Sequence, residues 1–297
     1  MSDAIRELVR DGDTLAIEGF THLVSFAAGH EVIRQRKRDL TLCRLTPDLV
    51  YDQMVGAGVA AKLVFSWLGN PGVGSLHAIR RRVERADPEP LELEEYAHFG
   101  MLGRYAADLP FYPLRSCFDS DLRASTQHPP GRLAVRRRGR LRGAAASPRR
   151  RRGARAAGRR GRQHPGVGAD RLPEGGRVRG RAGDRGGRGA GRRGGGARAD
   201  PNRTLLPGLV VDAVVVCPRG AHPSYAQGYC DRDNRFYLEW DRIARDPERL
   251  EAWLDEWVRG TAGHEEYVAK LGEERWRRLT PGPAPSGSVD YGDYGPS

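Results

Sequence analysis

Apolar and polar residues alternate along the first 122 residues in blocks that favour strands and helices in turn. Short apolar runs at 14–17, 40–43 and 61–67 are rich in Leu, Val, Ile and Thr, and they predict three strands. Residues 26–36, between the first two runs, have the apolar spacing of a helix, and a further helix is expected after a cap at Ser75. Because strands that alternate with helices pair in parallel, this part predicts an α/β fold with a mostly parallel sheet and flanking helices.

The same kind of pattern returns after about residue 197. The β-branched run 209–216 predicts a strand, and residues 218–225 are typical of a loop. Residues 247–259 predict an amphipathic helix whose apolar face consists of Leu250, Trp253, Leu254 and Trp257. This spacing is the packing signature of a helix that covers a core, so we interpret the two tryptophans as core residues.

Residues 123–197 interrupt this pattern. They contain 23 Arg, no Lys and three acids, a net charge of +20, so the rest of the chain carries −8 of the total of +12. The segment also has 19 Gly and no aromatic residue, and a sequence of this kind cannot build a core. We therefore expect one domain formed by residues 1–122 and 198–280, an intervening disordered segment at 123–197 without regular strands, and a loose Pro/Gly/Ser-rich tail at 281–297.

An arginine-rich segment can also indicate a nucleic-acid-binding protein. The tripeptides 185–187 and 193–195 have the Arg-Gly-Gly form found in RNA-binding tracts. Such tracts normally include aromatic residues on which bases stack, and this segment has none. We keep a nucleic-acid-binding protein as an alternative of another class, but we do not expect a nucleic-acid partner.

Cysteine and histidine spacing gives little sign of metal or redox chemistry. The four cysteines stand far apart with no C-x-x-C pair, and we interpret them as buried thiols of a cytoplasmic protein. The histidines show no metal-ligand spacing, so no metal is expected. His222 is interpreted as a loop histidine held by backbone groups rather than as a residue that lines a site. The longest apolar run, 209–217, contains Asp212, and residues 1–4 do not resemble a signal peptide, so no membrane association is expected.

Two glycine-containing turns directly follow predicted strands. One is at Gly19 and the other spans residues 69–74. Ligands of parallel α/β sheets collect at the carboxyl ends of the strands, and the helix start after Ser75 can hold an anion through its backbone N–H groups. Neither turn has the spacing of a Walker loop or a dinucleotide-binding fingerprint. The glycines therefore mark either a ligand-binding edge or tight turns alone.

Several motifs in both flanks resemble the A subunit of the family I CoA-transferases, closest to the glutaconate CoA-transferase branch. The motifs are Glu18-Gly19-Phe20-Thr21, Gly69-Asn70-Pro71-Gly72-Val73, Leu109-Pro110-Phe111, Asp200-Pro201, Pro207 to Val215, Gly220-Ala221-His222-Pro223-Ser224 and Glu256-Trp257-Val258. The resemblance covers residues 1–122 and 198–275. It implies the α/β fold of CoA-transferase subunits and a reaction that moves CoA between an acyl-CoA and a carboxylic acid.

The resemblance also implies which subunit carries the catalytic residue. In that family a glutamate attacks the acyl-CoA thioester and then carries CoA as its own thioester, and in two-subunit members this glutamate lies on the B subunit. We therefore expect a B-subunit partner in a heterodimer or heterotetramer, no catalytic residue in this chain, and CoA as a substrate rather than a permanent cofactor. One wall of the shared site is expected from Phe20, Thr21, Gly69, Asn70 and Gly72. The alternative enzyme is one component of a CoA-thioester hydrolase that cleaves a cyclic diketone.

The middle segment encodes a different amino-acid sequence when its codons are read from their second base. Over residues 148–193 the first and third bases of each shifted codon are then nearly fixed by the residue that is present. This reading permits a strand, a turn, a helix and a second strand, as the family would have there. We interpret the segment as the product of two compensating frameshifts or of sequencing errors. A chain with the sequence as it stands is then expected to be impaired as an enzyme, because it lacks these core strands.

Overall fold

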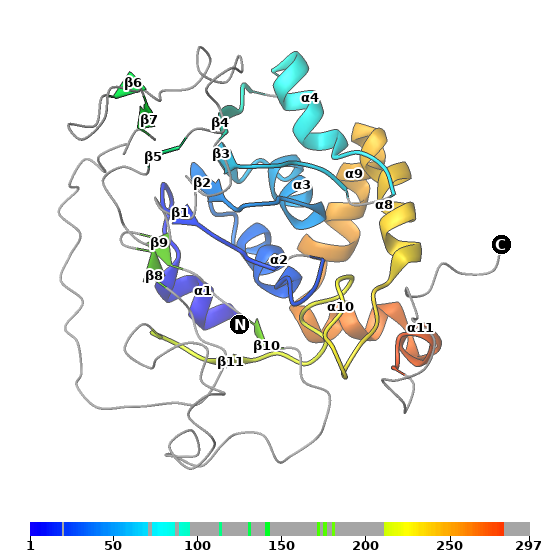
Figure 1. The fold of residues 1–297 in the computed structure, drawn as a ribbon. Helices are drawn as coiled ribbons and strands as arrows, with labels where there is room; N and C mark the ends of the chain where they lie inside the picture. Colours follow the sequence, from blue (N-terminus) through cyan, green and yellow to red (C-terminus); the bar gives the residue numbers. More distant parts are fainter. Residues whose placement is uncertain are drawn as a thin grey trace.

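The computed structural model describes residues 1–19, 21–70, 73–86, 89–95 and 211–281, together with the backbone of six short strands between residues 113 and 181. Within the described residues, a four-stranded sheet is accompanied by helices from both ends of the sequence (Figure 1). Among the helices of this part of the chain, none combines the length and the apolar character needed to cross a bilayer.

The four strands pair in parallel and in sequence order. They are β1 (Thr14–Leu15), β2 (Leu40–Cys43), β3 (Ala60–Phe65) and β4 (Glu92–Glu95). All three pairings are parallel, which confirms the predicted α/β fold with a mostly parallel sheet. Their register places four leucines in one row across the sheet: Leu15, Leu42, Leu63 and Leu93. The first three are buried, whereas Leu93 on the edge strand is 39% exposed.

Side chains alternate between the two faces of the sheet, as the pleat of a strand requires. Leu15, Leu42 and Leu63 belong to the main core, and Ala16, Cys43 and Val64 form a separate small cluster. Because each of the latter follows a core leucine by one position, the two clusters occupy opposite faces. The large aliphatic side chains thus point to the face on which the helices pack.

The helices come from two stretches of the sequence. They are α1 (Ser2–Leu8), α2 (Phe26–Arg34), α3 (Leu49–Gly56), α4 (His77–Arg85), α8 (Asn234–Arg245), α9 (Pro247–Leu254), a π-helical turn η4 (Asp255–Arg259), α10 (His264–Leu271) and α11 (Glu273–Arg278). The helix predicted at 26–36 is confirmed and ends two residues earlier. The helix predicted at 247–259 forms as α9 followed by the π-helical turn, with Leu250, Trp253 and Leu254 buried.

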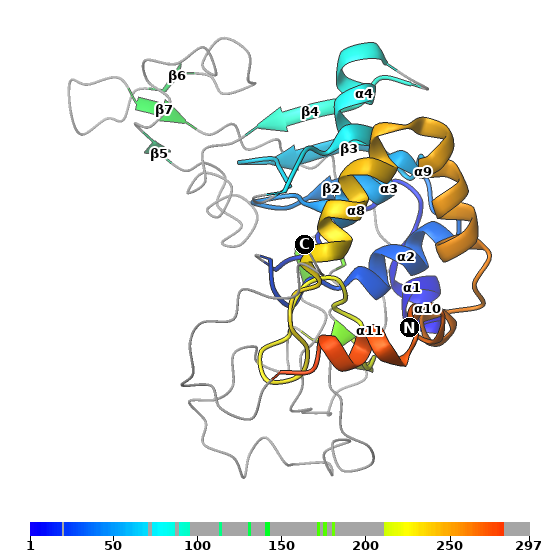
Figure 2. The ribbon, with the colours of Figure 1, turned by 90° about the vertical axis from the view of Figure 1, so that its right-hand side faces the viewer.

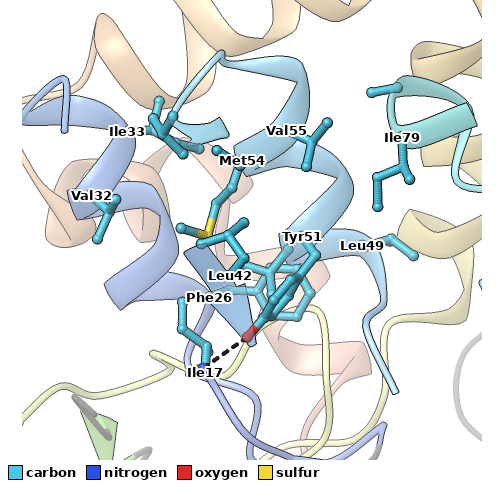
Figure 3. Close-up of a cluster of buried hydrophobic side chains, with 14 of the residues drawn as sticks. Ile17, Phe26, Val32, Ile33, Leu42, Leu49, Tyr51, Met54, Val55 and Ile79 are labelled. Carbon is cyan, nitrogen blue, oxygen red and sulfur yellow. Dashed lines mark hydrogen bonds between the residues drawn. The ribbon is translucent and has the colours of Figure 1, made fainter. Parts of the chain in front are cut away.

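One main core joins both flanks of the chain. It contains side chains of α2 and α3 from the N-terminal part (Figure 3) and of α8 and α9 from the C-terminal part. Figure 2 shows α8 and α9 beside α3, and α9 contacts both of the other two helices. A hydrogen bond between Asp52 of α3 and the indole N–H of Trp240 of α8, 2.9 Å long, ties the two parts together.

Close packing of α2 on α3 depends on Gly29. A Cβ atom at this position would collide with Val50 Cγ2 of α3. Met54 Sδ and Ile17 Cδ1 lie 3.5 and 3.6 Å from the same Cβ position, and both side chains are buried. Because glycine has no side chain, the backbones of α2 and α3 can approach closely here and leave no gap in the core.

Short strands make up the rest of the regular structure in the described part of the chain. They are β5 (Pro113–Leu114), β6 (Pro130–Gly131), β7 (Arg140–Arg142), β8 (Arg171–Leu172), β9 (Gly175–Gly176), β10 (Gly180–Arg181) and β11 (Val215–Val216). Five of them, β6 to β10, fall within 123–197, and the other residues of that segment lie outside the described part. The expectation that residues 123–197 form no regular strands is therefore wrong at these five strands. The expected disorder of the rest of the segment stays a prediction, and the same holds for the motif 109–111 and the tail from 282.

The strand predicted at 209–216 is shorter than expected. Only Val215 and Val216 form a strand, which pairs in parallel with β10, while residues 211–214 do not. Residues 209 and 210 lie outside the described part. Val214 and Val216 are 38% and 63% exposed, so the β-branched run does not gain the burial that makes such residues stable in a strand.

Candidate functional site

Three loops follow the carboxyl ends of β1, β2 and β3, and these ends lie at one edge of the sheet (Figure 2). The loop after β1 contains Gly19 and Thr21, and the loop after β3 contains Gly69 and Asn70. Between them lies the loop after β2, residues 44–48, which joins β2 to α3. This is the edge at which parallel α/β sheets bind ligands.

The loop after β1 has a strained backbone. Thr21 and Leu23 have φ angles of 56° and 50°, in the left-handed region that side-chain-bearing residues avoid. A β-branched residue such as Thr21 is especially unfavourable there, and each such residue costs about 1–3 kcal/mol. Observed strain of this kind concentrates at binding and catalytic sites.

A loop from the C-terminal part holds this strained segment in place. The N–H of Leu23 donates to the carbonyl of Tyr225 at 2.8 Å, and the N–H of Val24 donates to Ser224 Oγ at 3.1 Å. The rings of His22 and Tyr225 stack with their centroids 5.4 Å apart. The loop 220–225 therefore supports the segment that follows β1.

The loop after β2 is built on a buried ion pair. The guanidinium of Arg44, which is fully buried, donates to both carboxylate oxygens of Asp48 at 2.8 and 3.1 Å. It also donates to the main-chain carbonyl of Gly19 in the loop after β1. Burial lowers the pKa of Arg44, but the Asp48 carboxylate outweighs this effect and raises the pKa of Arg44 above its ordinary value, so Arg44 stays charged.

Main-chain groups of the same loop hold the turn after β3. The carbonyl of Leu45 accepts from the N–H groups of Ser66 and Trp67 at 3.1 and 3.0 Å. The carbonyl of Pro47 accepts from the N–H of Gly69 at 3.4 Å. Residues 44–48 thus contact both glycine turns and fix where they stand with respect to each other.

Asn70 is buried, with 4% of its surface exposed. Its main-chain carbonyl accepts from the N–H of Val73 at 3.4 Å, and it pairs with Gly74 in an isolated β-bridge. Among the described residues, neither its side-chain nitrogen nor its side-chain oxygen has a hydrogen-bond partner. Buried polar groups in folded proteins are nearly always paired, so an unpaired amide of this kind calls for an explanation.

A cavity of about 710 Å³ adjoins this turn. It lies between the turn after β3, helix α4 and the edge strand β4. Its walls are formed by Trp67, Leu68, Gly69, Asn70, Gly74, Ser75, Leu76, Ile79, Arg80, Val83, Glu84 and Leu93. Three large apolar side chains of this wall are partly exposed: Trp67 by 50%, Val83 by 46% and Leu93 by 39%.

The anion expected at the helix start after Ser75 is a side chain of the protein itself. Asp241 of α8 accepts from the N–H of Ser75 at 3.0 Å and contacts the ring of His77 at 2.8 Å. The helix α4 begins at His77 with Leu76 at its cap position, so the predicted cap at Ser75 is wrong. The carboxylate of Asp241 thus takes the place that a ligand anion would have at this N–H group, and it holds the turn against α8.

His222 has a role that sequence reasoning did not foresee. It is buried, and its ring contacts the hydroxyl of Tyr267 at 2.9 Å and the carboxylate of Asp233 at 2.8 Å. Burial lowers the pKa of His222, so the neutral ring donates to Asp233 and accepts from Tyr267. Arg275 also donates to Asp233, at 2.6 and 3.0 Å. His222 is therefore held by side chains rather than by backbone groups, in a network that fastens the loop 220–225 to α8, α10 and α11.

The structure places three of the five expected site residues. Thr21, Gly69 and Asn70 lie in the two turns that residues 44–48 hold, while Phe20 and Gly72 lie outside the described residues. Arg44 and Asp48 were missed. The available signal was an acid four positions after an arginine that directly follows a predicted strand, a spacing that pairs the two charges across a helix start.

No metal centre emerges from the part of the chain that the structure describes, where no group of three His, Cys, Asp or Glu residues is placed to hold an ion. Cys43, Cys217 and Cys230 are buried thiols, and Cys117 lies outside the described residues. Burial raises the pKa of Cys217 to about 11, which keeps it a thiol at neutral pH.

A parallel sheet with flanking helices, and with strained and glycine turns at its carboxyl edge, defines an α/β protein. The A subunit of 3-oxoadipate CoA-transferase from Pseudomonas knackmussii is 42% identical over 287 residues, which covers 92% of this chain and 97% of that protein. The chain therefore belongs to the family of CoA-transferase A subunits. The A subunit of glutaconate CoA-transferase from Acidaminococcus fermentans is 44% identical over 78 residues, 26% of this chain and 24% of that protein.

Solved structures show the same fold. The crystal structure of glutaconate coenzyme A-transferase from Acidaminococcus fermentans matches with a TM-score of 0.72 at 23% identity, over 95% of each chain. A variant of the decarboxylase AibA/AibB matches with a TM-score of 0.59 at 22% identity, over 86% of this chain and 96% of that one. No family model matches the chain.

Family membership confirms the main functional prediction. The chain is one component of a heteromeric CoA-transferase, an enzyme family that uses CoA as a substrate. Its place among the A subunits implies a B-subunit partner.

Proposed function

We propose that this chain and its B-subunit partner together transfer CoA from an acyl-CoA to a carboxylic acid, and that the chain supplies one wall of their shared site at the carboxyl edge of its sheet. The observation that carries this placement is the loop 44–48, which holds the turns after β1 and β3 together. Thr21, Gly69 and Asn70 lie in these turns, and Phe20 and Gly72 adjoin them in sequence.

The covalent chemistry belongs to the partner in this proposal. The carboxylate of a B-subunit glutamate attacks the thioester carbonyl, and the CoA thiolate leaves from the mixed anhydride that results. The thiolate then attacks the glutamyl carbonyl, which releases the first acid and leaves CoA as a glutamyl thioester. The second acid takes up CoA by the reverse of these steps. Each attack places negative charge on a carbonyl oxygen, and backbone N–H groups of fixed turns can stabilise such a charge.

The first acid to test is 3-oxoadipate, because the relative with 42% identity is named for it. The test mixes the purified complex of both subunits with an acyl-CoA, and with 3-oxoadipate or glutaconate as acceptor. Formation of the new acyl-CoA, followed by chromatography, supports the proposal. Transfer by this chain without its partner would overturn the assignment of the nucleophile.

A hydrolase is the second candidate. Its support is that the same fold is found in a decarboxylase, so the fold alone does not fix the reaction. A hydrolase releases free CoA thiol without forming a second acyl-CoA. If the pair liberates thiol at the same rate with and without an acceptor acid, and more readily from a CoA thioester whose acyl group carries a cyclic diketone, the hydrolase assignment replaces the transferase.

We also propose that residues 123–197 stand in a shifted reading frame. The relative aligns over 92% of this chain and 97% of its own length, so the segment occupies the place of a family segment and is not an added insertion. The test is the nucleotide sequence across codons 115–200. A pair of compensating single-base changes relative to an independent reading of the gene supports the proposal, and an unaltered frame contradicts it. The restored chain is expected to be active with its partner where the sequence as it stands is not.

A further inference from the structure

Resting on the proposed CoA transfer, we propose that the cavity beside Asn70 receives the amide-bearing arm of the thioester substrate, and that the Asn70 side chain pairs with an amide of that arm. In CoA the thiol is joined to the nucleotide through a thin chain with two secondary amides. The cavity of about 710 Å³ lies within the range of about 300–1,000 Å³ that small-molecule sites occupy.

The unpaired atoms of Asn70 indicate the chemistry of the missing group. The side chain has a donor and an acceptor, both buried, and among the described residues nothing pairs with either. A carboxylate offers only acceptors and would leave the oxygen of Asn70 unpaired. A secondary amide offers one N–H and one carbonyl, so it can satisfy both atoms of Asn70.

The cavity walls favour a neutral, partly apolar arm. Trp67, Leu76, Ile79, Val83 and Leu93 contribute apolar surface, on which the methylene and methyl groups of such an arm can pack. The row of core leucines across the sheet ends here, with Leu93 exposed at the edge strand.

The charges at this cavity neutralise each other. Arg80 and Glu84 lie in the wall as an ion pair, 2.6 Å apart, on the exposed side of α4. An anionic acid entering the cavity would find no net positive charge in this pair and would lose hydration against the apolar wall. The cavity therefore suits the arm of the thioester better than the free acid.

Asn70 stands on a turn that is fixed at both ends. Before it, the N–H of Gly69 donates to the carbonyl of Pro47. After it, Asp241 accepts from the N–H of Ser75, and a side chain at Gly74 would collide with Asp241. A polar group on a preorganised turn loses little conformational entropy when it binds a ligand. The fixed turn therefore favours a role of Asn70 in binding.

The experiment combines a variant with truncated substrates, in the complex of this chain with its B subunit. The substrates carry one acyl group on CoA, on N-acetylcysteamine, which keeps one secondary amide, and on butanethiol, which has none. We expect Asn70→Ala to lower kcat/KM about 5- to 20-fold for the amide-containing thioesters, as one or two lost neutral hydrogen bonds would. The butanethiol thioester should be transferred equally by both proteins.

Two further variants separate recognition from folding. Asn70→Asp keeps the shape but cannot donate, so it should lose the same preference for amide-containing thioesters. Gln35→Ala is the matched control, because it removes an amide that contacts Ser2 and Glu31 at the other end of the fold. Thermal melts of all three variants should stay close to that of the wild type.

The outcomes distinguish this inference from the proposed function. An equal loss of rate for all three thioesters, or no loss for any, would overturn the role of Asn70. If the wild-type pair transfers no CoA, binding of pantetheine is measured by the fluorescence of Trp67, with Trp67→Phe as the blank. Binding that weakens in Asn70→Ala would then support the cavity assignment while the transferase proposal fails, and binding that does not weaken would overturn both.

Discussion

The buried guanidinium of Arg44 donates a hydrogen bond to the main-chain carbonyl of Gly19, 25 positions earlier in the chain. The same guanidinium is paired with both oxygens of Asp48. Besides forming the ion pair, the guanidinium thus holds the turn that precedes Thr21. Arg44 is therefore a positioning residue for the proposed site, since it acts on the backbone of the turn and not on substrate.

Removal of Arg44 alone should destabilise the fold. Arg44→Met leaves Asp48 as an unpaired buried carboxylate, and we expect the free energy of unfolding to fall by about 3–5 kcal/mol in urea titrations. The double variant Arg44→Met with Asp48→Leu removes both charges and should recover most of this loss.

The double variant then tests positioning. Its fold is intact but the carbonyl of Gly19 has lost its donor, so kcat/KM of the complex with the B subunit should fall while the melting temperature stays near that of the wild type. Full activity in the double variant would show that the Arg44 contact does not position the turn.

Gly29 should be intolerant of even a methyl group. Alanine favours a helix over glycine by about 1 kcal/mol. We nevertheless expect Gly29→Ala to lower the free energy of unfolding by about 1–3 kcal/mol, because the new Cβ collides with Val50 of α3. Gly263→Ala is the control, since nothing lies within 4 Å of a Cβ there, and it should change stability by less than about 1 kcal/mol. A stabilised Gly29→Ala variant would contradict the close approach of α2 and α3.

His30 should make the fold sensitive to mild acid. Burial lowers the pKa of His30 to about 3, although a hydrogen bond with Gln53 opposes the shift. The unfolded chain binds a proton at this ring below about pH 6.5 and the folded chain does not, so stability is lost as the pH falls below that value. Between pH 6.5 and 4.5 this loss amounts to about 2–3 kcal/mol.

The variant His30→Phe removes this titration. In urea unfolding at pH 6.5 and pH 4.5, the difference in unfolding free energy between variant and wild type should therefore move in favour of the variant as the pH falls. His222 and His264 also have lowered pKa values because of burial, so part of the acid sensitivity remains in the variant. A difference that does not change with pH would mean that His30 has the same pKa in the folded and the unfolded protein.

Asp233 should contribute stability at neutral pH that disappears in stronger acid. Burial raises its pKa, but hydrogen bonds from His222 and Arg275 outweigh burial and hold the pKa well below its ordinary value. The contribution is therefore complete above the unfolded pKa of about 4 and is lost as the pH falls below it. Asp233→Ala should lower the free energy of unfolding at pH 7 by about 3–5 kcal/mol, because Arg275 is left without its main partner.

The check on Asp233 is the pH dependence of this cost. Urea titrations at pH 7 and pH 3 should show a smaller difference between wild type and Asp233→Ala at the lower pH. An equal difference at both values would indicate that Asp233 acts only as the cap of α8, through the N–H of Phe236.

Local patterns in the sequence predicted part of the regular structure. The strands β1 to β3 and helices α2 and α9 belong to this part, and so do the turns with Gly69 and Asn70. Helix α3 was not predicted, because its polar residues Asp52 and Gln53 are buried among the apolar ones, so no separate polar face marks the helical period. A helix of this kind looks like any short apolar run.

Contacts between distant residues explain the rest of what the sequence did not reveal. The acceptor of Arg44 lies 25 positions away, and the carboxylate that fills the helix start after Ser75 lies 166 positions away on α8. Nothing in the neighbourhood of Ser75 distinguishes a site for a ligand anion from a site for an internal one. The anion is internal because the fold brings Asp241 of α8 next to the start of α4.

The bond between Asp52 and Trp240 spans 188 positions, so the core of this protein closes only after nearly the whole chain has left the ribosome. Until then the apolar surface of α3 and its neighbours has no partner in the C-terminal part. The entropy of closing such a loop depends on its length only logarithmically, at about 0.6 kcal/mol for each doubling, and not on which residues it contains. As far as this entropy is concerned, a change in the identity of the residues between Asp52 and Trp240 leaves the cost of bringing the two side chains together unchanged, whereas a change in their number alters it.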